Sequence, residues 1–500
     1  MSRELTMNDG GKSDDAIVPK KAPNRGRPGE GLEGRAEAKG NMRGAVTLRT
    51  QSRGGVSPGL LHVRERARAE RKARFTCLRH HVSGERLKTA YLRLNRKSAA
   101  GLDGITWAEY GERLGEHLQS LEERLRSGAY RAGAGRRVRI PKADGGERLL
   151  AIANLEDKIV QTATSEVLEA IYEEDFKGFS YGFRPGRSQH QALDALAAGI
   201  FQKRVNWILD ADIRSFFDTI DHKWMVKMLG VRIGDRGLLR WIRQWLVAGV
   251  SEHGKTIESA KGIPQGGAIS PLLANVYLHY VFDLWAHVWR ERIAKGDVIL
   301  IRYADDTIVG FERREDAERF RRDLESRLEK FGLALNPDKT RLLEFGRYAE
   351  ERRRRAGHRK AESFDFLGLT HVCGRSRNGR FLLVRRTSAK RMRRRLREMK
   401  EELIHKRHLP IAEQGAWLRK VVQGYFNYHA VPTNSGSLHG FRSALGRTWW
   451  QSLNRRSQKR SVTWGRMLKL KERWIPRVEV RHPWPLERFA RHTQGGSPVQ

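Results

Sequence analysis

The feature that most constrains the fold is a pair of apolar runs separated by only three residues. Val298–Tyr303 and Thr307–Phe311 are rich in β-branched and aromatic side chains, and Ala304-Asp305-Asp306 lies between them. A connection this short leaves room only for a tight turn, so the runs are predicted to pair as a β-hairpin. Two adjacent carboxylates at its tip would repel each other beside buried strands, and a divalent cation would remove that conflict.

A third carboxylate follows a similar stretch upstream. Val205–Ala211 is apolar and β-prone, and Asp212 comes directly after it. Carboxylate oxygens suit Mg²⁺, which keeps open positions for substrate phosphates. Two such ions, about 3.5–4 Å apart, can activate an attacking hydroxyl and stabilise a leaving oxygen. We therefore predict that Asp212, Asp305 and Asp306 bind two Mg²⁺ ions and catalyse the attack of a primer 3′-OH on a nucleotide α-phosphate. The alternative is a surface turn, the commoner setting of a lone Asp-Asp pair.

The charge of the chain points to a polyanionic partner. There are 97 Lys and Arg residues against 58 Asp and Glu, a formal net charge of +39. Nucleic acid is the commonest partner of so basic a protein. A general solubility surface is the alternative, but negative charge would serve that purpose equally well.

The excess charge is concentrated in one region. Residues 351–400 hold 18 Lys and Arg against 4 Asp and Glu. Within it Met392, Leu396, Met399 and Leu403 recur on one face of a predicted helix, and Arg393-Arg394-Arg395 lie between them. The polar face of this helix could lie on a phosphate backbone, although a merely solvated face has the same pattern.

Strands and helices mix without a regular βα repeat, which favours an α+β fold. Helical spacing is visible at Leu87–Leu94, Leu114–Leu125 and Leu155–Ile171, whereas Val138–Ile140 and Phe364–Thr370 are predicted strands. The two cysteines lack partners at metal-ligand spacing, which argues against a disulfide framework or a Cys-rich zinc module. The chain contains no apolar run of about 18 residues, so the sequence predicts no membrane span. We expect a cytoplasmic protein, associated with nucleic acid.

Several motifs, in a fixed order, resemble those of group II intron-encoded reverse transcriptases. Tyr303-Ala304-Asp305-Asp306 is similar to the polymerase motif of that family. The other matching segments are Gly101–Thr106, Ile140–Lys142 followed by Arg148, Gly182–Ser188, Asp212–Asp218, Gly262–Gly267, Asn336–Thr340 and Phe366–Gly368. The resemblance implies a right-hand polymerase with fingers, palm and an α-helical thumb and maturase region.

The resemblance also assigns roles to individual residues. Asp212, Asp305 and Asp306 match the metal-binding triad. Lys142 and Arg148 match positions in the fingers that contact the triphosphate of the incoming nucleotide, where cations offset its charge.

Three further residues match nucleotide-facing positions of the family. Phe217 lies where an aromatic ring packs against the sugar, and its bulk would exclude a 2′-OH; a core phenylalanine is the alternative. Gln265 matches a residue near the incoming nucleotide, and the neighbouring Gly266 and Gly267 permit close backbone approach. Lys339 could assist the departing pyrophosphate, or it could be a surface lysine after a turn.

The C-terminal region interleaves aromatic and basic residues, as in Trp417-Leu418-Arg419-Lys420. It resembles the thumb and maturase region of the intron proteins, where basic groups hold phosphates and aromatic rings stack on unpaired bases. The RNA-binding candidates are Arg393, Arg394, Arg395, Arg419 and Lys420. The predicted divisions are a flexible tail (1–65), a helical extension (66–135), fingers and palm (136–370), thumb and maturase region (371–480) and a C-terminal tail (481–500).

The resemblance implies an RNA-directed DNA polymerase that binds a group II intron RNA, assists its splicing and copies it into DNA. Its substrates and partners would be dNTPs, a primer and a DNA target. We expect no membrane partner. No Cys-rich HNH-type endonuclease segment follows the maturase-like region, so we expect the primer to come from elsewhere, such as a replication fork or a nick. The alternatives are a reverse transcriptase recruited to a host role such as defence, and an RNA-binding splicing factor that no longer polymerises. The oligomeric state stays open.

Overall fold

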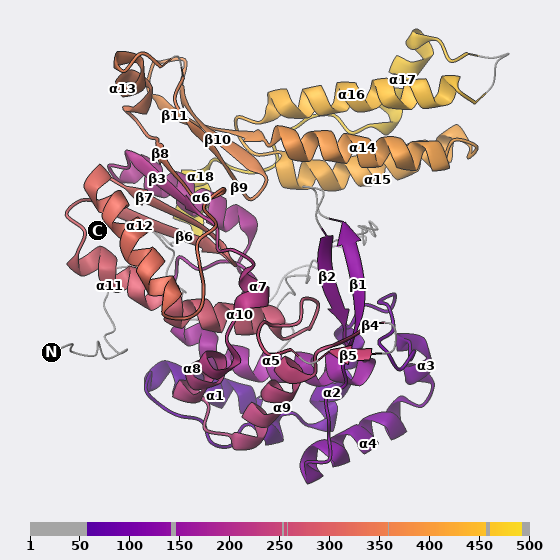
Figure 1. Ribbon diagram of the computed structural model, residues 1–500. Coiled ribbons are helices and arrows are strands. Elements are labelled where there is room, and N and C mark those ends of the chain that lie inside the picture. Colours follow the sequence, from indigo (N-terminus) through magenta and orange to yellow (C-terminus); the bar gives the residue numbers. More distant parts are fainter. Residues whose placement is uncertain are drawn as a thin grey trace, which may run out of the picture.

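A computed structural model describes residues 58–141, 147–252, 255–257, 259–358, 360–456 and 461–492. These residues form helices and three β-sheets, which confirms the predicted mixture of the two (Figure 1). Most of the segment predicted to be a flexible tail lies outside the described residues. Its last part does not fit that description, because a helix begins at Pro58 and buries Leu60 and Val63 in the core.

Helices fill the N-terminal region, as the spacing of its leucines predicts. They are α1 (Pro58–Ala69), α2 (Gly84–Arg93), α3 (Trp107–Glu112), α4 (Leu114–Ser127) and the long α5 (Leu155–Asp175). α1 and α2 pack directly on α5. A capping box starts α3, because Thr106 Oγ1 accepts from Glu109 N while the Glu109 carboxylate accepts from Thr106 N.

The first sheet has the order β2-β1-β4-β5. Its strands are β1 (Gly135–Pro141), β2 (Glu147–Ile152), β4 (Val250–Glu252) and β5 (Lys255–Ile257). β1 and β2 form an antiparallel hairpin that extends the predicted strand at Val138–Ile140. In Figure 1 this hairpin projects from the helical base of the molecule toward the C-terminal helices.

The central sheet has the order β6-β7-β3-β8, with all neighbours antiparallel. Its strands are β3 (Trp207–Ala211), β6 (Val298–Tyr303), β7 (Asp306–Phe311) and β8 (Arg341–Glu344). The predicted hairpin of two apolar runs is therefore confirmed. β6 is buried along its length except at Tyr303, because α6 (Gln189–Gln202) packs against it; α12 (Arg314–Glu329) packs on β3 and β7.

Further helices lie along the chain between these elements. They are the short 3-10 helix η2 (Arg79–His81), α7 (Phe216–Thr219), α8 (His222–Arg232), α9 (Arg236–Val247), α10 (Ser270–Leu278), the π-helix η3 (His279–Asp283), α11 (Leu284–Arg292) and α13 (Ala349–Arg355). α10, η3 and α11 follow one another without a break. They form one long helical segment whose middle has π geometry.

The third sheet corrects one prediction. The sequence predicted a single strand over Phe364–Thr370, but the chain reverses at Leu367 and Gly368, where φ is 47° and 82°. The run is therefore split into β9 (Ser363–Phe366) and β10 (Leu369–Arg375), which pair antiparallel. β11 (Phe381–Thr387) completes the sheet beside β10. A turn position with positive φ favours glycine, so Gly368 was the local signal for the break.

A second hydrophobic core lies among the C-terminal helices. These are α14 (Ala389–His405), α15 (Ile411–His429), α16 (Ser435–Asn454) and α17 (Trp464–Trp474). Met399 and Leu403 are buried in this core, and Met392 and Leu396 pack against it, which confirms the predicted apolar face of α14. Trp449 is fully buried there as well.

The end of the described chain returns to the first core. The predicted C-terminal tail contains α18 (Pro485–His492), which packs on α6. Phe489 is 4% exposed, and Arg488 Nε lies 3.0 Å from Asp194 Oδ2. This helix thus fastens the C-terminal region to the central part of the molecule.

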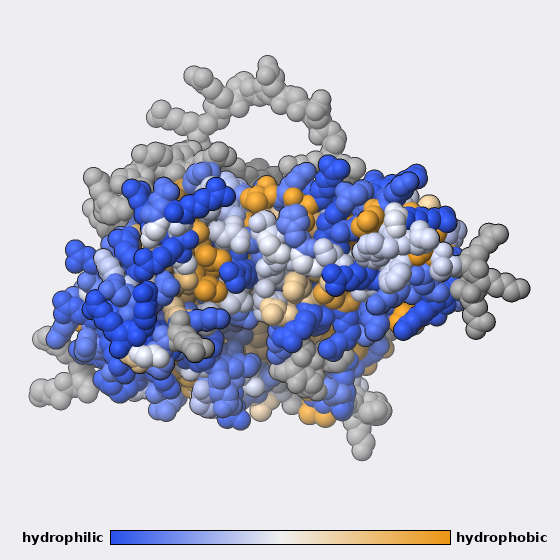
Figure 2. Space-filling model, turned by 90° about the horizontal axis from the view of Figure 1, so that it is seen from above, coloured by the Kyte–Doolittle hydropathy of each residue, from blue (hydrophilic) through white to orange (hydrophobic). Residues whose placement is uncertain are grey.

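The surface agrees with the high charge of the chain. Seen from above, it is mostly hydrophilic, with small and separate apolar areas (Figure 2). Among residues 58–492, as far as they are described, none of the helices combines the length and the apolar character that crossing a bilayer needs.

Candidate active site

Two of the three candidate aspartates lie at the tip of the β6–β7 hairpin. Tyr303 and Asp306 are the last paired residues, so Ala304 and Asp305 are the two central residues of the turn. Ala304 has a φ of 57°, a left-handed conformation that is uncommon for a residue with a Cβ. Ala304 is buried, whereas Asp306 stays in contact with solvent. The carboxylates at the tip therefore lie next to a buried backbone position, Ala304.

Asp212 is brought to this tip by the order of the sheet. It follows β3 directly, and Ala211 pairs with Thr307, the residue after Asp306. Its main chain is fixed further by a hydrogen bond from Asn336 N to Asp212 O of 2.8 Å. Asp212 Oδ2 lies 3.7 Å from Lys339 Nζ. The structure therefore brings together four residues that the sequence predicted from three separate segments: Asp212, Asp305, Asp306 and Lys339.

Burial and neighbouring carboxylates raise the pKa of two aspartates at this tip, Asp306 and Asp210. The surrounding protein raises the pKa of Asp306 to about 7 by desolvation, although one side of the residue is open to solvent, and Asp305, Asp212 and Asp210 raise it further. Burial likewise raises the pKa of Asp210 to about 6, while Arg341, at 3.4 Å, opposes this shift. A group of carboxylates that disfavours its own charge is a suitable place for a cation.

The donor set fits a hard divalent cation in its chemistry. All three candidate side chains offer carboxylate oxygens, the ligands that Mg²⁺ prefers. Within the described residues, no three His, Cys, Asp or Glu side chains are gathered closely enough to enclose an ion. The Lys339 ammonium lies beside Asp212 instead and supplies part of the positive charge.

The loop that carries Gln265 is joined to the helix that carries Phe217. Ile263 N donates to Phe217 O at 2.7 Å, and Gln265 Nε2 donates to Asp218 Oδ1 at 3.1 Å. The Phe217 ring is half-buried and lies edge-on to Phe216, with ring centroids 5.4 Å apart. Phe217 and Gln265, predicted from different motifs, thus belong to one connected surface.

Two glycines of this loop, Gly262 and Gly266, are required by close backbone contacts. A Cβ on Gly262 would lie 2.9 Å from Phe217 O, and one on Gly266 would lie 2.8 Å from Ala151 O. Both glycines also have positive φ, of 88° and 115°. The loop can therefore pack against α7 and β2 only with glycine at these positions.

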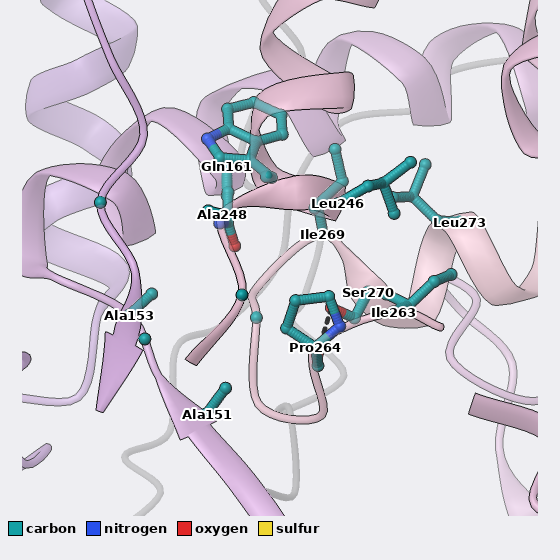
Figure 3. Close-up of a pocket in the computed structure, with 15 residues that line it drawn as sticks. Ala151, Ala153, Gln161, Leu246, Ala248, Ile263, Pro264, Ile269, Ser270 and Leu273 are labelled. Atoms are coloured by element: carbon teal, nitrogen blue, oxygen red, sulfur yellow. Dashed lines mark hydrogen bonds between the residues drawn. The ribbon is translucent and has the colours of Figure 1, made fainter. Parts of the chain in front are cut away.

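A small cavity of about 30 Å³ lies behind this loop (Figure 3). Its lining is mostly small and apolar, with Ala151, Ala153 and Ala248 on one side and Ile263 and Pro264 on the other. The Ser270 hydroxyl donates to Pro264 O at 2.7 Å and closes the loop on itself. The space is too small for a nucleotide, so it belongs to the packing of the loop.

The structure describes the two fingers candidates only in part. Arg148 lies on β2, paired with Ile140 across the hairpin. Lys142 lies outside the described residues. Both roles therefore remain predictions.

The basic residues of the C-terminal helices occupy different settings. On α14, Arg393 and Arg394 are exposed, while Arg395 is half-buried and lies 2.9 Å from Glu398. On α15, Lys420 is exposed, whereas the Arg419 guanidinium stacks 5.4 Å from the ring of Trp474 and donates to Arg473 O. Arg419 is exposed as well, but its guanidinium is engaged with α17.

Sequence reasoning missed a buried group behind the aspartate turn. Arg302 has no exposed surface and contacts Asp283, Asn275 and Ala304. The available signal was an arginine within an otherwise apolar run, Val298–Tyr303. A charge inside a buried strand requires a partner, but the partner lies in a distant helix.

Comparison with known proteins adds to this geometry. Residues 140–371 match the family described as reverse transcriptase (RNA-dependent DNA polymerase). The chain is 32% identical over 330 residues to protein YkfC of Escherichia coli (strain K12), an alignment that covers 59% of this chain and 82% of that protein.

Two further relatives have more informative names. The group II intron-encoded protein LtrA of Lactococcus lactis subsp. cremoris is 37% identical over 165 residues, which are 33% of this chain and 27% of that protein. The nuclear intron maturase 3, mitochondrial, of Arabidopsis thaliana is 30% identical over 181 residues, 32% of this chain and 25% of that protein. The chain thus spans about a quarter of the length of these two relatives.

Proposed function

The chain belongs to the family of group II intron-encoded reverse transcriptases and maturases, and on this basis we propose how it acts. It is an RNA-directed DNA polymerase that binds a group II intron RNA, assists its splicing and copies it into DNA during intron mobility. The observation that carries this proposal is the convergence of Asp212 with the Asp305-Asp306 turn at one edge of the central sheet. Primer extension on an RNA template tests it.

Asp212, Asp305 and Asp306 would hold two Mg²⁺ ions. Bound there, the ions would supply charge stabilisation for an in-line displacement at phosphorus. In that displacement the primer 3′-oxygen forms a bond to the α-phosphorus, and the bond from this phosphorus to the pyrophosphate oxygen breaks. The rigid hairpin orients the carboxylates, and Lys339 can offset the charge of the departing pyrophosphate.

The nucleotide would lie over the surface formed by α7 and the 262–267 loop. Gln265 is held by Asp218 at its side chain and by Ala151 N at its carbonyl, 2.8 Å away, so its position is fixed before a substrate arrives. Arg148, on β2, and Lys142 would contact the triphosphate. In this proposal the β1–β2 hairpin belongs to the fingers, the central sheet to the palm, and α14 to α17 to the thumb.

Replacement of Phe217 by valine is expected to relax the choice of sugar. The half-buried ring leaves no space for a 2′-OH if the sugar packs against it, and valine opens that space. We expect the preference for dNTP over rNTP in kcat/KM to fall about tenfold or more, on the order of 1.4 kcal/mol. Single-nucleotide incorporation assays with dGTP and GTP measure this ratio.

The neighbouring Phe216 provides the matched control. It is 2% exposed and packs in the core, so Phe216→Leu should lower stability and leave sugar selectivity unchanged. Unchanged selectivity in Phe217→Val would show that Phe217 is a packing residue.

Loss of charge on α14 is expected to weaken RNA binding. Arg393 and Arg394 are exposed on the polar face of this helix, where they can contact phosphates. The double variant Arg393→Gln/Arg394→Gln should bind the intron RNA several-fold more weakly, and the slope of log K against log[salt] should fall by about 1–2. Filter binding at several salt concentrations measures both quantities.

The control removes the same charge from another helix. Arg319 and Arg321 are partly exposed on α12, where they lie near Asp323 and Glu325. Arg319→Gln/Arg321→Gln should leave the salt slope unchanged. An equal loss in both double variants would mean that net charge, rather than α14, determines RNA affinity.

A further inference from the structure

The turn that carries the candidate aspartates has a conformation that its sequence does not favour. Ala304 and Asp305 are its two central residues, and only the first of them has positive φ. A two-residue hairpin turn of this kind normally has glycine at the first position. An alanine there carries a steric cost, because its Cβ crowds the neighbouring backbone. The surroundings must therefore hold the turn in place.

One buried side chain holds the carbonyl of this turn. Arg302 Nη1 donates to Ala304 O at 2.9 Å, and no part of Arg302 is exposed. The backbone of Gly182 lies against the other side of Ala304, so closely that a Cβ on Gly182 would overlap Ala304 N. Ala304 is thus fixed by a hydrogen bond to its carbonyl and by contact at its amide.

The guanidinium of Arg302 is itself fixed in all directions. Nε and Nη2 donate to the two carboxylate oxygens of Asp283, at 2.7 and 2.5 Å, in a bidentate pair. Nη1 also donates to Asn275 Oδ1 at 3.0 Å. Asp283 and Asn275 are 0% and 1% exposed. A planar group held at both edges cannot rotate away from Ala304 O.

Asn275 connects this group to the segment beside the hairpin. Its Nδ2 donates to Gly182 O at 2.7 Å, so the same amide contacts Arg302 and the residue that packs on Ala304. The backbone of Arg302 is bonded to that segment as well, through Phe179 O at 2.9 Å and Tyr181 N at 2.8 Å. Arg302, Asn275, Asp283 and Gly182 therefore form one closed network around the turn.

The helix that supplies Asp283 is shaped for this contact. Asp283 is the last residue of the π-helix η3, which lies between α10 and α11. An extra residue in one turn changes the direction of the side chains that follow, and single π turns often occur at functional sites. Here the π turn lies between Asn275 and Asp283, and both side chains bind the guanidinium of Arg302.

Stability alone does not account for a buried ion pair. Removing two charges from water is strongly unfavourable, and well-packed apolar replacements are often neutral or stabilising. The distinctive contribution of this pair is the direction that it gives to the third arm of the guanidinium, toward Ala304 O.

We propose that Arg302, oriented by Asp283 and Asn275, is a positioning residue that holds the Asp305-Asp306 turn in its catalytic geometry. This inference rests on the proposed polymerase function. A misplacement of about 1 Å at a reacting group can cost 10²-fold in rate, so the network should govern kcat and not the affinity for nucleic acid.

The test replaces the ion pair by an apolar pair, Arg302→Met with Asp283→Leu, so that no unpaired charge stays buried. We expect kcat for primer extension to fall about 30- to 100-fold. The Kd for primer–template, from fluorescence anisotropy, should stay within about threefold, and Tm should change by a few degrees at most. Amide hydrogen exchange should accelerate in peptides that cover 298–311, which gives a readout independent of activity.

The matched control is another buried ion pair. Arg232 Nε and Asp175 Oδ2 are 2.9 Å apart with side chains 2% and 10% exposed, and Arg232 donates to the backbone of residues 67–73 rather than to the turn. Arg232→Met with Asp175→Leu should leave kcat and the exchange of 298–311 unchanged. A stable Arg302→Met/Asp283→Leu variant with wild-type kcat and wild-type exchange would overturn the proposal.

Asn275→Ala decides the matter if the double variant does not fold. It leaves the ion pair intact but removes one support of Arg302 and the bond to Gly182, so kcat should fall several-fold with unchanged Kd. Unchanged kcat and unchanged exchange in Asn275→Ala would overturn the proposal. Absence of primer extension by the wild-type protein would instead refute the polymerase function, and the exchange of 298–311 would still report on the turn.

Discussion

Asp306→Asn is expected to abolish primer extension on an RNA template, with kcat lowered by about a thousandfold or more, equivalent to about 4 kcal/mol. The substitution keeps the shape of the side chain and removes the charge that would bind the cation. Folding should not suffer, because desolvation and then the neighbouring Asp305, Asp212 and Asp210 already disfavour a negative charge on Asp306 and raise its pKa. Extension of a DNA primer with Mg²⁺, wild type against variant, measures the effect.

Asp338→Asn is the control for this experiment. Asp338 is exposed, lies one residue before Lys339, and is outside the group of facing carboxylates. This variant should extend primers at the wild-type rate. Wild-type activity in Asp305→Asn and Asp306→Asn would refute the site assignment.

The same variant separates chemistry from RNA binding. The apolar face of α14, the helix that carries the exposed arginines, packs in the second core, whereas Asp306 lies on the central sheet. Asp306→Asn should therefore bind intron RNA and assist its splicing as the wild type does. A parallel loss of splicing would mean that the carboxylate turn also takes part in contacts with the RNA.

Local patterns in the sequence were sufficient for the hairpin but not for its supports. The two apolar runs and the short connection between them determine a β-hairpin without reference to the rest of the chain. The apolar run Val205–Ala211 predicted a strand before Asp212, but the local pattern could not place this strand beside the hairpin, because the pairing of β3 with β7 spans about a hundred residues of chain. Periodicity carries no information about which strands become neighbours.

The errors of prediction also have physical causes. Phe364–Thr370 has the composition of one strand, and only the positive φ at Leu367 and Gly368 makes it two. The helix at the C-terminal end has too few apolar residues to predict its docking, which depends on Phe489 and on the Arg488–Asp194 pair. Gly368 was a local signal for the break, whereas the docking of α18 depends on tertiary contacts that the local sequence does not encode.

Gly182→Ala is expected to reduce primer extension about a hundredfold, although it adds only one methyl group. The new Cβ would lie 2.9 Å from Tyr303 C and 3.0 Å from Ala304 Cα, and closer still to Ala304 N. These neighbours are backbone atoms, so no side chain can rotate to make room. Either the hairpin tip or the 179–182 segment must move, and a shift of about 1 Å at the carboxylates is enough for a loss of this size.

A second glycine of the same motif distinguishes this clash from a general effect of the substitution. Gly186 has a φ of 73°, but a Cβ there would meet nothing within 4 Å. Gly186→Ala should therefore cost only about 1–2 kcal/mol of stability and leave kcat close to the wild-type value. Equal losses of kcat in the two variants would show that the clash with Ala304 is not the cause of the loss. A loss confined to Gly182→Ala, with little change in Tm or in affinity for primer–template, would show that the position of the aspartate turn limits the rate.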